Sequence, residues 1–144
     1  MKKIVVIDGQ GGKIGALLVG RLKAELEQVE ICAIGTNSIA TSAMLKAGAH
    51  AGATGENPVI VNCRSAELIV GPIGIVVADS LIGEITPAMA VAIGQSKAHK
   101  VLLPVNRCKT HVVGARSLPV SDLIEEAMKE MIAILQEKEC DDVE

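Results

Sequence analysis

Apolar residues in this chain fall into two patterns, short continuous runs and stripes with helical spacing. The runs are rich in Val, Ile and Leu, which is typical of strands buried on both faces of a parallel sheet. They predict strands at 4–7, 29–34, 68–70 and 100–104. The stripes predict helices that begin near Ile14, Thr36, Thr86 and Ser121. Alternating strands and helices predict a single α/β domain over residues 1–137, followed by an acidic tail at 138–144.

Two further segments have strand-like composition but no clear place in this order. Val59–Asn62 is followed by only a few residues before Leu68, whereas a parallel crossover needs about a dozen. Either 59–62 is an antiparallel or edge segment, or the crossover helix has shrunk to one turn, and its direction in the sheet stays open. We expect a loop at 52–58 and a strand at Lys109–Val113.

Glycines are concentrated directly after the first predicted strand, where the chain turns into a helix. The turn contains Gly9, Gln10, Gly11, Gly12, Lys13 and Ile14, with Gly15 just beyond it. Backbone N–H groups in such a turn, together with the helix dipole, favour a bound phosphate. The spacing is G-x-G-G-x-x-G, which departs from the usual dinucleotide fingerprint G-x-G-x-x-G. A P-loop fits worse, because Ile14 stands where Ser or Thr is needed. We expect a three-layer, Rossmann-like fold with an open, mostly parallel sheet flanked by helices.

Two more turns are expected at the same edge of the sheet, because ligands of open α/β sheets lie at the carboxyl ends of the strands. One holds Thr36 and Asn37, and the other holds Gly71, Pro72, Ile73 and Gly74. We expect the turns to share one cleft for a phosphate-bearing ligand. The alternative is that they are three unrelated connections.

The residues after the second strand bear on the choice of cofactor. An acid for the ribose hydroxyls is usual there in NAD-binding proteins, yet none appears before Glu56, so NAD is disfavoured. Thr36 and Asn37 suit a 2′-phosphate, although the usual Arg is missing. We expect NADP or another nucleotide.

Candidate chemistry beyond the turns is sparse. Asn106 and Arg107 follow the last inner strand and are candidate contacts to the ligand, Arg107 to an anion. Cys108 and His111 would point to opposite faces of a strand, which makes a catalytic pair improbable. Asp8 is expected to brace the glycine turn rather than transfer a proton. No catalytic residue is assigned, and no cluster has the spacing of metal ligands.

The composition of the chain excludes some classes of binding partner. The chain has no Phe, Tyr or Trp, its net charge is −3, and it lacks a basic run, so nucleic acid is not expected as a partner. The longest uncharged apolar stretch, 68–78, is interrupted by glycine and proline and is shorter than the about 20 residues of a membrane span. No signal peptide is recognisable. We therefore expect a cytoplasmic protein with no membrane partner.

Several motifs together resemble a family of small bacterial proteins of unknown function that is described as Rossmann-like. They are Ile7–Gly12, Ile34–Asn37, Gly52–Asn57, Gly71–Gly74 and Leu103–Cys108. The resemblance covers nearly the whole chain and implies the fold and a cytoplasmic location. It implies no substrate, activity or catalytic residue.

Three functions are compatible with these observations. The leading hypothesis is a nucleotide-binding or sensor module that acts through a partner or as a homodimer, because one small sheet leaves apolar helix faces to cover. A small NADP-dependent reductase, with Asn106 and Arg107 near its substrate, is the alternative enzyme. An interaction protein without a nucleotide ligand is the third.

Overall fold

The computed structural model describes residues 1–105 and 109–141, with side chains as far as Glu137. Its sheet has five strands in the order β3-β2-β1-β4-β5, and each neighbouring pair is parallel. The strands are β1 (Lys2–Asp8), β2 (Val29–Gly35), β3 (Ala51–Thr54), β4 (Leu68–Pro72) and β5 (His99–Leu103). This is the order of the first five strands of a Rossmann sheet, with the topological switch between β1 and β4.

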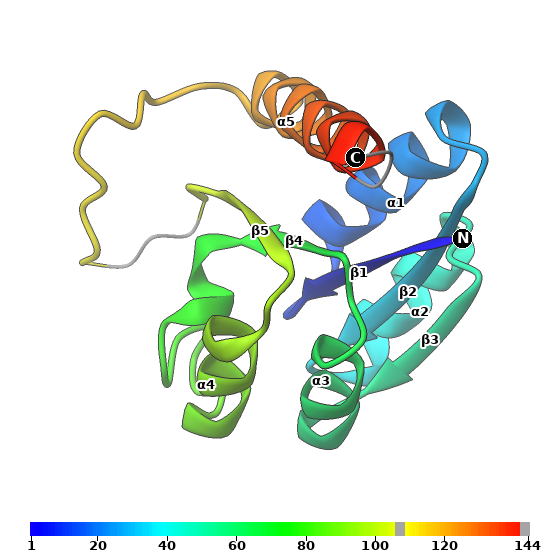
Figure 1. Ribbon diagram of the computed structural model, residues 1–144. Coiled ribbons are helices and arrows are strands. Elements are labelled where there is room, and N and C mark those ends of the chain that lie inside the picture. The colour runs from blue at the N-terminus through cyan, green and yellow to red at the C-terminus, as the bar shows by residue number, and fades with distance from the viewer. Residues whose placement is uncertain (106–108, 142–144) are drawn as a thin grey trace.

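Helices cover both faces of the sheet, which gives the three layers seen in Figure 1. The helices on one face are α1 (Lys13–Glu25), α2 (Ser38–Lys46) and α5 (Val120–Asp141). Those on the other face are α3 (Glu56–Cys63) and α4 (Pro87–Gln95), together with the 3₁₀ turn η1 (Ile73–Val76). The predicted α/β architecture is therefore confirmed.

Strand β1 is the centre of the core. Ile4 and Val6 pack with α1 and α5, whereas Val5 and Ile7 pack with α3 and α4, because successive side chains of a strand point to opposite faces. All four side chains are completely buried. Burial of an aliphatic side chain of this size stabilises a fold by about 1.5–3 kcal/mol. This explains why the strand is continuously apolar rather than alternating.

The helices begin where their capping residues predict. Asn37 caps α2 by accepting a hydrogen bond from the N–H of Ala40 at 2.9 Å. Thr86 caps α4 through the N–H of Met89 at 3.2 Å, and Pro87 follows in the first turn. The expected apolar stripe of α5 is also buried. Its members are Leu123, Ile124, Ala127, Met128, Met131 and Leu135.

The region around residues 51–63 differs from the sequence-based expectation. The loop predicted at 52–58 is instead most of the edge strand β3 and the start of helix α3, and Val59–Asn62 lies inside α3 rather than in a strand. Small residues let β3 pass under α2, since a Cβ on Gly52 would lie 2.9 Å from Leu45. In α3 the β-branched residues are accommodated because Val59 is buried against the sheet. Tertiary packing overrides their preference for strands.

The expected strand at Lys109–Val113 is also wrong. This segment is irregular, Lys109 has a φ of 39°, and the side chain of Val113 is fully exposed. The segment lies away from the sheet, and the chain continues from it to α5 (Figure 1). Helix α5 continues to Asp141, so the backbone of the first residues of the predicted acidic tail is helical. Within the described residues no helix is long and apolar enough to cross a membrane.

Candidate functional site

The glycine turn joins β1 to α1 as predicted. Gly12 adopts a left-handed conformation (φ 72°) and occupies the N-cap position of α1. Its N–H donates to the carbonyl of Gly9 at 2.9 Å, which closes the turn. Gln10 also has a positive φ, of 50°. The strand, the turn and the helix therefore follow each other without an intervening loop, which is the arrangement that presents backbone N–H groups to an anion.

Asp8 braces the turn from beneath. Its side chain is buried, and its two oxygens accept hydrogen bonds from the N–H groups of Gly9 at 2.8 Å and Gly15 at 2.7 Å. Burial raises the pKa of this carboxyl, although the two N–H donors oppose the shift. Because both oxygens are occupied, Asp8 has a structural role, as expected from the sequence.

Three of the four glycines at the turn are required by packing. A Cβ on Gly9 would lie 2.5 Å from the hydroxyl oxygen of Thr36, and one on Gly15 would lie 2.5 Å from the sulfur of Met44. A Cβ on Gly12 would meet the backbone of Ala40 at 2.7 Å. These glycines are explained without any ligand.

Gly11 differs, because a Cβ there would meet nothing within 4 Å. The N–H groups of Gly11, Lys13 and Ile14 make no hydrogen bond with any part of the chain that the structure describes. Helix α1 has no side-chain cap and no acidic residue in its first turn, and Lys13 is exposed. Asp8 already accepts the N–H of Gly15 in the first turn of α1, so what remains at this helix end is the set of three N–H groups without an acceptor.

A carboxylate that the sequence analysis missed lies on the other side of the turn. Glu84 belongs to the segment between η1 and α4, and its Oε1 accepts three hydrogen bonds. The donors are the hydroxyl of Thr36 at 2.7 Å, the amide of Asn37 at 2.6 Å and the N–H of Gln10 at 3.0 Å. Glu84 thus joins two of the three predicted turns. No local pattern marks it, because it lies 48 positions after Thr36.

The pKa of Glu84 is set by opposing effects. Partial burial by itself raises it, but the hydrogen bonds from Thr36, Asn37 and the N–H of Gln10 together outweigh burial. The pKa of Glu84 therefore lies below its usual value, and the carboxylate is ionised at neutral pH.

The segment that carries Glu84 has an unusual backbone. Asp79, Leu81, Ile82 and Gly83 all have positive φ, at 66°, 55°, 56° and 85°. This tight course turns Leu81 inward, where it is buried, and exposes Ile82. Conformations of this kind are costly for residues other than glycine and persist only where surrounding contacts hold them.

Leu81 separates the glycine turn from the third predicted turn. Its side chain lies 2.8 Å from a Cβ on Gly9 and 3.6 Å from one on Gly74. The third turn is divided between two elements, because Gly71 and Pro72 end β4 whereas Ile73 and Gly74 begin η1. A Cβ on Gly71 would collide with the carbonyl oxygen of Ile7, so strand packing explains that glycine. The space between the turns is thus filled by a side chain.

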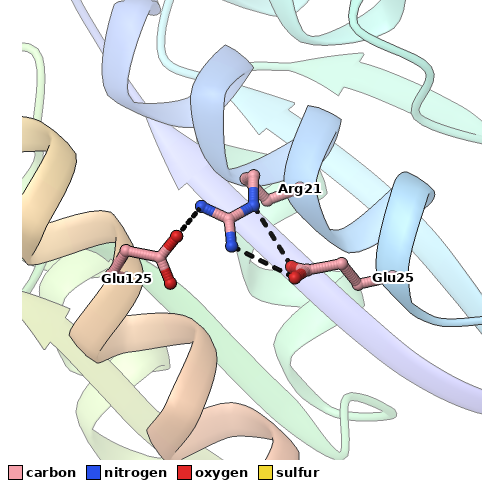
Figure 2. A network of polar contacts seen from close by, with 3 residues as sticks. All are labelled: Arg21, Glu25 and Glu125. Carbon is pink, nitrogen blue, oxygen red and sulfur yellow. Dashed lines mark hydrogen bonds and ion pairs between the residues drawn. The ribbon is translucent and has the colours of Figure 1, made fainter.

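A cavity of about 420 Å³ lies beside the start of α1, in the groove between α1 and α5. Lys13 and Ile14 line it together with the partly exposed apolar side chains of Leu17 and Val120. Figure 2 shows Arg21 of α1 in contact with Glu125 of α5 and with Glu25 of its own helix. Arg21 pairs with Glu125 at 2.7 Å and with Glu25 at 3.1 Å, which raises the pKa of Arg21 and lowers that of Glu125.

Some candidates are not brought into this site. Asn106, Arg107 and Cys108 lie outside the described residues. Cys32 and Cys63 are buried in the core, and burial raises the pKa of both thiols, that of Cys63 to about 11. Within residues 1–105 and 109–141, no three His, Cys, Asp or Glu side chains gather as metal ligands do.

The strand order and the turn define this protein as a Rossmann-like α/β protein with a glycine-rich first turn. The chain belongs to the family described as "Domain of unknown function (DUF3842)", whose model matches residues 3–136. The resemblance inferred from the sequence motifs is thereby confirmed at the level of an uncharacterised family.

A solved structure with a similar chain path is the dodecameric FMN-dependent UbiX-like decarboxylase from Escherichia coli O157:H7. It is 20% identical in sequence, with a TM-score of 0.44, and the match covers 93% of this chain and 76% of that one. No protein with a curated description matches.

Proposed function

We propose that this protein binds a phosphate-bearing nucleotide at the start of α1 and acts as a binding or sensor module. The observation that carries this proposal is the set of three N–H groups, at Gly11, Lys13 and Ile14, that have no acceptor within the described residues. A phosphate group has enough oxygens to accept all three, and the helix dipole and the Lys13 ammonium both favour its charge.

The open face of Gly11 supports the same position for the phosphate. Since nothing lies within 4 Å of a Cβ there, the backbone is approachable from outside. The neighbouring Gly9 is covered by Thr36 and Leu81. These contacts favour a phosphate position near Gly11 and Lys13 over one near Leu81.

The test is the change in melting temperature of the full chain with ribonucleoside mono-, di- and triphosphates and with NAD and NADP. A ligand at about one hundred times its Kd stabilises the folded state by about 2.7 kcal/mol, which raises the Tm of a domain of this size by several degrees. We expect at least one nucleotide to do so.

Gly11→Val is the matching variant, because a Cβ there meets nothing within 4 Å and the added side chain would occupy the open space in which the phosphate is proposed to bind. We expect it to keep the Tm of the free protein and lose the shift. Gly20→Val is the control, since a Cβ at Gly20 also meets open space but lies farther along α1. A shift that survives in Gly11→Val would place the ligand elsewhere. No shift with any nucleotide would favour an interaction protein without one.

The remaining expectations stay predictions. A reductase needs the groups at Asn106 and Arg107, and turnover with NADP in the wild type but not in Arg107→Ala would support it. Homo-oligomerisation is tested by the particle mass from light scattering, and a location in the cytoplasm by cell fractionation.

A further inference from the structure

We propose that Glu84 is the specificity-determining residue of the nucleotide site: it accepts the ribose hydroxyls and excludes a ligand that carries a phosphate on that ribose. This inference rests on the proposed function and narrows its ligand to nucleotides with free 2′- and 3′-hydroxyls. It also reverses the cofactor expectation from the sequence, because NADP carries a 2′-phosphate and NAD does not.

The position of Glu84 relative to the turn is the first support. Its Oε1 lies 3.3 Å from a Cβ on Gly9 and accepts the N–H of Gln10, so the carboxylate is adjacent to the first glycine of the turn. It also contacts Thr36 and Asn37, directly after β2. In Rossmann units the acid that binds the ribose occupies the end of the second strand. Here the chain supplies an acid to the same place from the segment after β4.

The two oxygens of the carboxylate have different surroundings. Oε1 takes all three hydrogen bonds from the protein, whereas Oε2 accepts none from any described residue. Glu84 is only partly buried, so part of the residue is accessible from solvent. An anchored carboxylate with one free oxygen is suited to accept hydroxyl hydrogens from a diol.

The same anchoring disfavours a phosphate in this position. Three donors hold the carboxylate next to Gly9, so movement away from a second anion would break three hydrogen bonds. Two anions at contact distance repel each other strongly where solvent is partly excluded. The nearby donors of Thr36 and Asn37 are already occupied by Oε1, which leaves them unable to compensate a phosphate.

The experiment measures dissociation constants of the full chain for two pairs of probes that differ by a 2′-phosphate. The pairs are adenosine 5′-monophosphate with adenosine 2′,5′-bisphosphate, and NAD with NADP. We expect the wild type to prefer the member without the 2′-phosphate by at least about tenfold, which is about 1.4 kcal/mol.

Glu84→Gln is the diagnostic variant, because its Oε1 still accepts from Thr36, Asn37 and Gln10 while the charge and the second acceptor are lost. We expect the preference to fall about tenfold. A purely structural role would weaken both members of a pair equally and leave the ratio unchanged. Glu56→Gln is the control. The Glu56 carboxylate accepts a hydrogen bond from the hydroxyl of Thr86 at 2.6 Å and is not among the hydrogen-bond partners found for Gln10, Thr36 or Asn37 within the described residues.

The outcomes separate the two proposals. If the wild type binds both members equally, or if Glu84→Gln keeps the wild-type ratio, the role of Glu84 is overturned and nucleotide binding stands. If neither member of either pair binds, the role of Glu84 is overturned, whereas nucleotide binding falls only if the melting-temperature panel is negative as well.

Discussion

The carboxylate of Glu84 accepts a hydrogen bond of 2.7 Å from the hydroxyl of Thr36, although the two residues lie 48 positions apart in the chain. This contact joins the segment after β4 to the end of β2, across the central strand of the sheet. It gives the edge of the sheet an anchored negative charge on one side of the glycine turn. On the other side, the start of α1 presents unpaired N–H groups.

Removal of the Glu84 carboxylate should destabilise the fold. In Glu84→Ala the donors of Thr36, Asn37 and Gln10 lose their common acceptor. We expect the free energy of unfolding to fall by about 1–3 kcal/mol, toward the lower end because water reaches part of the site. Chemical denaturation measures it. Glu56→Ala, which removes one exposed hydrogen bond, should change it far less. Equal effects of the two variants would contradict a stabilising role for the three hydrogen bonds to Glu84.

The stabilisation by Glu84 should depend on pH. Its folded-state pKa is lowered, because the hydrogen bonds from Thr36, Asn37 and Gln10 outweigh the effect of burial. A lowered pKa means that the contribution is complete above the ordinary value of 4.5 and is lost as the pH falls through the folded-state pKa. The difference in unfolding free energy between wild type and Glu84→Gln should therefore be constant near neutral pH and shrink in acid. A difference that grows in acid would contradict this.

Gly12 and Gly11 should respond oppositely to the same substitution. Gly12→Ala forces alanine into a left-handed conformation, which costs about 1–2 kcal/mol, and brings its Cβ to 2.7 Å from the backbone of Ala40. Gly11→Ala meets no atom within 4 Å, so the loss of backbone freedom in the unfolded chain should leave stability unchanged or raise it by about 0.4–1 kcal/mol. Thermal unfolding of the two variants checks this. A Gly11→Ala variant as unstable as Gly12→Ala would contradict the open space at Gly11 in this turn.

The buried thiols should be unreactive in the folded protein. Burial raises the pKa of Cys63 to about 11 and also raises that of Cys32, so the reactive thiolate is scarce at pH near 8. We expect a maleimide reagent to label peptides with these cysteines only after denaturation, as read by mass spectrometry. Rapid labelling of either one in the native protein would contradict the packing of this face of the sheet.

The sequence predicted the features that depend on local pattern. The apolar run of β1, the glycine turn, the caps at Asn37 and Thr86 and the stripe of α5 were all readable, because each follows from the period or the capping chemistry of its own segment. Helix α3 was not, because Val59–Asn62 has the composition of a strand and becomes helical through packing against the sheet.

The residues of the candidate site also divide into those that a local pattern predicts and those that depend on the tertiary fold. Residues 9–14 were identified because a turn between a strand and a helix has a recognisable spacing. Glu84 was missed because its role depends on the strand order, which brings the segment after β4 beside the end of β2. Leu81, which fills the space between two of the predicted turns, was missed for the same reason.

Equilibrium dialysis of the wild-type protein against nucleotide, read by near-ultraviolet absorbance, shows whether a nucleotide binds at the start of α1. The chain has no Phe, Tyr or Trp, so absorbance in excess on the protein side reports bound nucleotide almost alone. We predict an excess for wild type and Gly20→Val, and none for Gly11→Val. No excess for wild type with any nucleotide, or the same excess for Gly11→Val, would contradict binding at the start of α1.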